Sequence, residues 1–138
     1  MASDFAAAKA KYAGRPRETL KVLYDHELRN CPGKSIVGLE LRYAPHGWSP
    51  PHRHAGATAV AHVLEGVFLS GMNGTPPHVY TPGETFVELP GCHHTVSDNA
   101  SSTAPMRAIV VLVVDTAVLR TEKGYAALLE IDAGWEGA

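Results

Sequence analysis

Short extended segments separated by glycine and proline turns dominate the middle of this chain. The clearest covers residues 37–43, where Val37, Leu39 and Leu41 share one face and charged residues occupy the other, the alternation of a half-buried strand. Strands are predicted over residues 19–24, 37–43, 58–64, 67–70, 85–89, 93–97 and 107–114, the last as a strand buried on both faces. Many short strands with closely spaced turns indicate an all-β sandwich or barrel.

The two ends of the chain are less regular. A helix is predicted at the N-terminus, over roughly residues 4–13. The tail is ambiguous, because residues 125–131 fit either a helical turn or a last strand. We expect one domain over residues 1–138, divided into an N-terminal helical arm (1–18), a barrel core (35–114) and a C-terminal tail (115–138).

Composition and charge argue against nucleic acid and membranes as partners. Hydrophobic residues make up 45% and charged residues 19% of the chain, as in a folded globular protein. The formal net charge is −2 and no basic run occurs, so we expect no nucleic-acid partner. The longest apolar run, residues 108–114, is too short to cross a bilayer. No signal-peptide core is visible, so we expect no membrane association and a cytoplasmic location.

The distribution of histidines indicates a candidate metal site. Seven of the eight histidines lie between residues 46 and 94. His52 and His54 are one residue apart, so on an extended backbone their imidazoles project to the same side. A second pair, His93 and His94, follows a Pro-Gly turn in a distant segment. Neutral imidazole binds divalent transition metals, and three such ligands leave positions for substrate, water or dioxygen. The alternative is that His-x-His in a loop is a surface accident.

Two motifs resemble those of the cupin superfamily. The first comprises Pro45, Gly47, Pro50, His52, His54 and the stretch His62-Val63-Leu64-Glu65-Gly66, and the second comprises Gly83-Glu84, Pro90-Gly91, His94 and Asn99. The resemblance implies a double-stranded β-helix (jelly-roll) barrel with a short N-terminal helix. It also implies that His52, His54 and His94 bind a metal. Spacing from Gly83 selects His94, whereas spacing back from Asn99 is one residue off, which keeps His93 as the alternative ligand.

One position departs from the family pattern. Counting back from Gly66, the usual glutamate ligand is replaced by Ala59, and no carboxylate lies between His54 and Glu65. The chain therefore resembles a three-histidine cupin or a cupin without metal. Three-histidine centres are similar to those of certain cupin dioxygenases, which implies a divalent metal ion, Fe²⁺ in preference to Zn²⁺, Mn²⁺ or Ni²⁺. The chain is also similar to small single-domain cupins of secondary-metabolite pathways.

The resemblance implies a metal-dependent oxidoreductase of dioxygenase type that acts on a small organic molecule. His62 and Glu88 are the candidate catalytic residues, His62 as a proton carrier near neutral pH and Glu88 as an inward-facing base. A solvated surface position is the alternative for both. Isomerase, cyclase, dehydratase or decarboxylase chemistry on a Lewis-acid metal is a second reading, and non-catalytic ligand binding is a third. A homodimer is expected, because dimer packing would cover edge strands.

Overall fold

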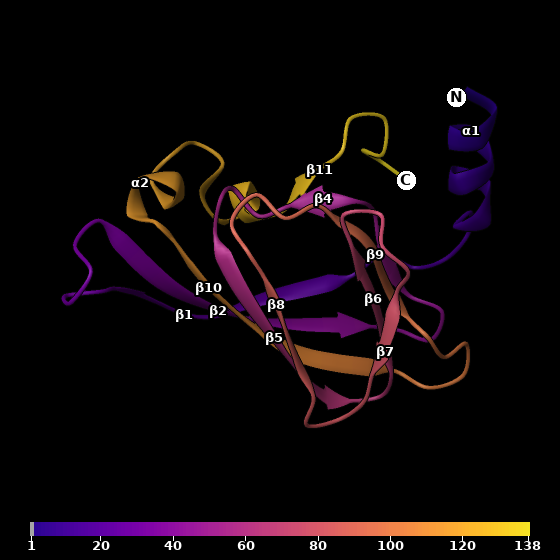
Figure 1. Cartoon of the computed structure of the whole chain (residues 1–138), viewed down its shortest axis with the longest axis horizontal. Helices are drawn as coiled ribbons and strands as arrows, with labels where there is room; N and C mark the ends of the chain where they lie inside the picture. Colours follow the sequence, from indigo (N-terminus) through magenta and orange to yellow (C-terminus); the bar gives the residue numbers. More distant parts are fainter. Residues whose placement is uncertain (1) are drawn as a thin grey trace.

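The protein folds into two facing antiparallel β-sheets with short helices at both ends (Figure 1). The structure is a computed structural model that describes residues 2–138, with side chains from residue 5 onward. Its elements are α1 (Ala2–Lys11), β1 (Thr19–Glu27), β2 (Lys34–Tyr43), β3 (Trp48–Ser49), β4 (His52–Arg53), β5 (Thr58–Glu65), β6 (Phe68–Met72), β7 (His78–Tyr80), β8 (Thr85–Glu88), β9 (His94–Asn99), β10 (Met106–Asp115), α2 (Thr116–Leu119), the 3-10 helix η1 (Gly124–Leu128) and β11 (Glu130–Ile131). The all-β prediction is confirmed.

Strand order explains how distant motifs meet. One sheet runs β1-β2-β10-β5-β8, and the other runs β11-β4-β9-β6-β7 with β3 paired to β9. Strand β9 therefore lies beside β4, and His52 pairs directly with His94. Strand β8 lies at the edge of the first sheet beside β5, where Ala59 pairs with Glu88.

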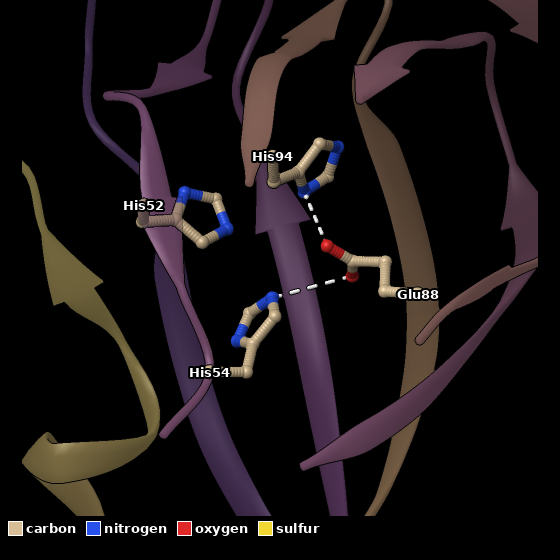
Figure 2. A group of neighbouring side chains, drawn as sticks. All are labelled: His52, His54, Glu88 and His94. Atoms are coloured by element: carbon tan, nitrogen blue, oxygen red, sulfur yellow. Dashed lines mark ion pairs between the residues drawn. The ribbon is translucent and has the colours of Figure 1, made fainter. Parts of the chain in front are cut away.

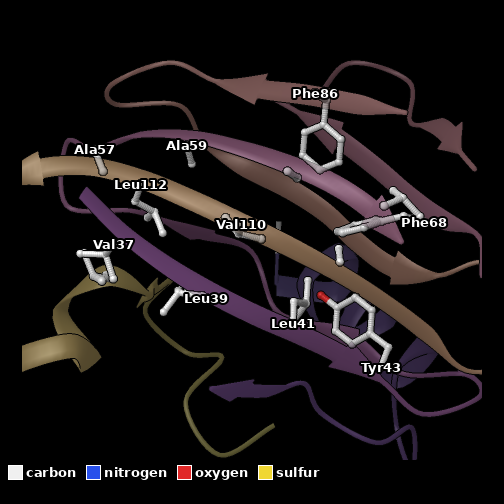
Figure 3. Close-up of a cluster of buried hydrophobic side chains, with 14 of the residues drawn as sticks. Val37, Leu39, Leu41, Tyr43, Ala57, Ala59, Phe68, Phe86, Val110 and Leu112 are labelled. Carbon is white, nitrogen blue, oxygen red and sulfur yellow. The ribbon is translucent and has the colours of Figure 1, made fainter. Parts of the chain in front are cut away.

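The core fills the space between the sheets (Figure 3). Along β2 and β10 every second side chain is buried, as the period of two requires. Tyr43 and Phe86 each meet the ring of Phe68 edge-to-face, with ring centroids 5.9 and 5.3 Å apart. The prediction that residues 107–114 are buried on both faces was wrong. The outward side chains of β10 are only half-buried, because no layer of the described chain covers that face.

Both ends pack against the same side of the barrel. Tyr12, just after α1, stacks on Trp48 with centroids 4.2 Å apart. The tail contains both structures that the sequence left open, since η1 is followed by β11, which pairs with β4. Among the described residues, no helix is long and apolar enough to cross a membrane.

A glycine is required in the turn between β5 and β6. Gly66 has a φ of 79°, a left-handed conformation that other residues adopt only at a cost. A Cβ atom there would lie 2.4 Å from the carbonyl oxygen of Pro105. The glycine of the Glu65-Gly66 dipeptide in the first motif is thus explained by backbone geometry.

Candidate metal centre

Four side chains from three strand regions converge inside the barrel (Figure 2). We call this set, which comprises His52, His54, Glu88 and His94, the histidine–glutamate group. One nitrogen or oxygen atom of each lies within 4.8 Å of the corresponding atom of every other member. Glu88 Oε2 is 3.2 Å from His54 Nε2, and Glu88 Oε1 is 3.1 Å from His94 Nδ1. His52, Glu88 and His94 are each only 3% exposed.

The second nitrogen of each imidazole has a partner that holds the ring. His52 Nδ1 lies 2.7 Å from the carbonyl oxygen of Pro50. His54 Nδ1 lies 2.7 Å from the carbonyl oxygen of Leu128, in η1. His94 Nε2 lies 2.8 Å from the hydroxyl of Ser70, on β6. Such outer contacts fix the tautomer and leave the inward nitrogen as the ligand atom.

The inward atoms themselves lack hydrogen-bond partners. His54 Nε2, Glu88 Oε1 and His94 Nδ1 are all buried without one. The Glu88 oxygens lie within ion-pair distance of His54 and His94, but no hydrogen bond forms between them. Ligand atoms held about 2.0–2.2 Å from one ion lie roughly 3 Å apart when adjacent. Buried, unpaired atoms at this spacing fit a divalent cation at their centre, since a buried polar atom left unpaired is costly.

The electrostatics suit a cation at His52 and Glu88. At His54 burial alone would lower the pKa, but the Glu88 carboxylate outweighs it and raises that pKa, so a cation there would have to displace a proton. Burial, reinforced by His94 and His54, lowers the pKa of His52 to about 3, so its ring is neutral. Burial alone would raise the pKa of Glu88, but the close approach of His54 and His94 outweighs it and holds that pKa well below its ordinary value. Glu88 is therefore a carboxylate. Neutral imidazole and ionised carboxylate are the forms that bind metals.

Glu88 occupies the place of the carboxylate that the first motif lacks. Ala59 on β5 is fully buried and pairs across the sheet with Glu88 on β8. Paired residues in neighbouring strands project from the same face of a sheet. A glutamate reaching inward from β8 thus enters the same space as one from position 59. The sequence identified Glu88 as an inward-facing residue but assigned it to proton transfer rather than to the ligand set.

The other candidates lie elsewhere. His62 is exposed on the outer face of β5, because Ala61 and Val63 on either side of it face the core, so the structure does not bring it to the group. His93 points away from the group, and its Nε2 contacts the Asp132 carboxylate at 2.8 Å. Adjacent strand residues face opposite sides, which separates His93 from the buried His94.

A cavity of about 450 Å³ opens on the group. Its walls include three buried hydroxyls, those of Tyr43, Ser49 and Ser97, which we call the hydroxyl trio. Sequence reasoning missed the two serines. Residues of η1 and β11 close one side of it. The Ser70 contact and the Leu128 carbonyl were also missed, since nothing in the local sequence marks a backbone oxygen or a lone serine as a partner of a distant histidine.

Comparison with known proteins gives matches over the same part of the chain. The family model described as Cupin domain matches residues 39–112, more than half of the sequence. Germin-like protein subfamily 2 member 2 of Arabidopsis thaliana is 38% identical over 84 residues, covering 56% of this chain and 38% of that protein. Germin-like protein 8-10 of Oryza sativa subsp. japonica is 35% identical over 98 residues, covering 62% and 44%. The chain spans less than half the length of these two relatives.

Solved structures agree on the fold. A protein with a double-stranded β-helix domain from Klebsiella pneumoniae superposes with a TM-score of 0.60 at 16% identity, covering 76% of this chain and 82% of that one. An oxalate oxidase in complex with the substrate analogue glycolate gives a TM-score of 0.56 at 22% identity, covering 78% and 59%. At these identities the likeness extends to the fold alone, and it confirms the jelly-roll barrel.

Proposed function

The chain belongs to the cupin domain family, and on this premise we propose that it is a metal-dependent oxidoreductase of dioxygenase type that acts on a small organic molecule. The observation that carries the proposal is the histidine–glutamate group, whose buried inward atoms converge without hydrogen-bond partners. An oxalate oxidase has the same fold, so this fold is compatible with an oxidative reaction.

His52, His54, Glu88 and His94 would hold the ion, which we propose to be Fe²⁺, with Zn²⁺, Mn²⁺ or Ni²⁺ as the alternatives. A bound divalent ion would supply Lewis-acid or redox chemistry at the positions that these ligands leave free. The three imidazole rings are held in place by the Pro50 carbonyl, the Leu128 carbonyl and the Ser70 hydroxyl, so their ligand atoms keep a fixed direction. Glu88 is assigned here as a ligand, since its depressed pKa makes it a poor proton store.

Metal analysis of the purified protein, loaded in turn with each of the four ions, tests this proposal. We expect one ion per chain and its loss in His54→Ala, because that change removes a ligand from the buried group. The matched control is His62→Ala, which removes an imidazole from the outer face of β5 and should keep the metal. Protein that binds none of the four ions, or equal metal loss in both variants, contradicts the proposal.

Oxygen uptake with a panel of small organic compounds separates the reaction classes. Uptake that requires iron supports the dioxygenase assignment. Turnover with Zn²⁺ and no oxygen consumption would replace it with isomerase, cyclase, dehydratase or decarboxylase chemistry on the same residues.

A further inference from the structure

Away from the histidine–glutamate group, the walls of the cavity are mainly apolar. Leu39, Leu41, Phe68, Phe86, Val110 and Leu128 are among the side chains that line it. All six are buried, and they come from five different elements. A volume of about 450 Å³ falls within the range of roughly 300–1,000 Å³ that is common for small-molecule sites. The cavity therefore has room for a substrate body well beyond the atoms that touch the metal.

Outside the histidine–glutamate group, the charged residues that line this cavity are Arg17 and Glu18, and they form an ion pair. Arg17 Nε and Nη2 lie 3.0 and 3.2 Å from the two carboxylate oxygens of Glu18. The remaining guanidinium nitrogen donates to the backbone oxygen of Ala138 at 3.2 Å. Among the described lining residues, no cation is left to pair with a second carboxylate. A carboxylate buried without a partner costs far more than a neutral group does.

The hydroxyl trio supplies one unspent donor. Tyr43 Oη lies 2.6 Å from Ser49 Oγ and 2.8 Å from Ser97 Oγ. Burial raises the pKa of Tyr43 despite these two contacts, so its hydroxyl stays protonated. Three hydroxyls carry three protons, and the two contacts use two of them. One O–H is thus available to a neutral acceptor in the cavity.

We infer that the substrate carries one oxygen donor for the metal on a largely apolar body whose far part is uncharged and bears a hydrogen-bond acceptor, such as a ketone, for the hydroxyl trio. This inference rests on the proposed function, because the metal fixes the head of the molecule. It separates this cavity from one made for a small dicarboxylate. Glycolate binding by the oxalate oxidase relative is therefore no guide to the size or polarity of this substrate.

Three probes that share a benzoate head and differ at the far end test the inference. They are 4-acetylbenzoate, with a neutral acceptor, 4-ethylbenzoate, with none, and terephthalate, with a second carboxylate. Isothermal titration is run on Zn²⁺-loaded and on metal-free protein. We expect 4-acetylbenzoate to bind about 3- to 10-fold more tightly than 4-ethylbenzoate, the effect of one neutral hydrogen bond. Terephthalate should bind at least about 10-fold more weakly than either.

Two variants assign these preferences to residues. The triple variant Tyr43→Phe, Ser49→Ala and Ser97→Ala should abolish the preference for the acetyl over the ethyl probe and keep 4-ethylbenzoate binding. It removes all three O–H donors of the trio, whereas each single change leaves at least one O–H free. Glu18→Gln should strengthen terephthalate binding several-fold by releasing Arg17, and it should leave 4-ethylbenzoate unchanged. A loss of the acetyl preference in the first variant and a gain in terephthalate binding in the second, with 4-ethylbenzoate binding kept in both, cannot come from a general loss of folding.

Terephthalate binding as tight as that of 4-ethylbenzoate overturns the inference, as does failure of all three probes to bind. An acetyl preference that survives in the triple variant shows that the hydroxyl trio is not the donor. Failure of the proposed function is a separate result, because it appears as absence of metal in the metal analysis whatever the order of the probes.

Discussion

The cavity contains two polar groups that differ in how their hydrogen bonds are satisfied. In the hydroxyl trio, Tyr43 bonds both serines. In the histidine–glutamate group, the outward nitrogens have partners while the inward atoms of His54, Glu88 and His94 have none. Both groups are buried within one barrel, so burial alone does not distinguish them.

The difference indicates which group is suited to bind a charged ligand. A buried group that satisfies most of its own hydrogen bonds contributes to the stability of the fold by itself. A buried group with converging unpaired atoms contributes most when a cation joins it. The trio should therefore matter to the free energy of unfolding with or without metal, and the histidine–glutamate group should matter mainly to metal affinity.

The largest effect is expected for Glu88. Glu88→Ala removes the single carboxylate of the group, and the metal affinity should fall by about 100-fold or more. Adding Ala59→Glu to that variant should recover much of the affinity, because position 59 pairs with position 88 across β5 and β8. Metal titration of the three proteins measures both changes.

The single variant Ala59→Glu is the control for moving the carboxylate from position 88 to position 59. Ala59→Glu alone places two carboxylates in one buried space, so it should destabilise the protein. If the double variant binds metal no better than Glu88→Ala, the carboxylate position is not interchangeable and Glu88 has a role besides ligation.

An intermediate effect is expected for Ser70. Its hydroxyl holds His94 Nε2 at 2.8 Å, so Ser70→Ala frees that ring without removing a ligand. Metal affinity should fall by about 10-fold. Ser49→Ala, which removes a serine hydroxyl from the trio instead, is the matched control and should leave metal affinity unchanged in the same titration. Equal losses in the two variants would show that the two groups act as one.

The smallest effect is expected for the trio. Tyr43→Phe leaves two buried serine hydroxyls without their partner, and the free energy of unfolding should fall by about 1–3 kcal/mol. Urea unfolding with and without metal measures it. The loss should be the same in both conditions, because Tyr43 does not contact the ion in our assignment. A loss confined to the metal-loaded protein would remove the distinction between the groups.

The sequence predicts most of the fold and three of the four members of the group. Alternation in residues 37–43 follows from one face being buried, and the parity of β5 places His62 outside once Ala61 and Val63 are taken as core. His52 and His54 share a side because strand side chains repeat every two residues. These are local rules, and local rules can be applied to a sequence.

The remainder depends on contacts between segments far apart in the sequence. The parity of Glu88 with Phe86 indicates an inward side chain, but only the pairing of β8 with β5 shows that it meets the space beside Ala59. The Leu128 carbonyl reaches His54 across 74 residues of sequence separation. The half-burial of β10 depends on which layer covers its outer face, and periodicity carries no information about that.

The contact between the Leu128 carbonyl and His54 connects the C-terminal segment to the proposed metal site. Residues of β11 pair with β4, and the Glu130 carboxylate accepts a hydrogen bond from the Ala55 backbone at 2.6 Å. With the proposed ion bound, docking of this segment and occupancy of the ion would be linked equilibria. Whatever factor the docked segment adds to metal affinity, the bound ion adds to the docking of the segment. Occupancy of an interior site would in this way be transmitted to the surface of the protein.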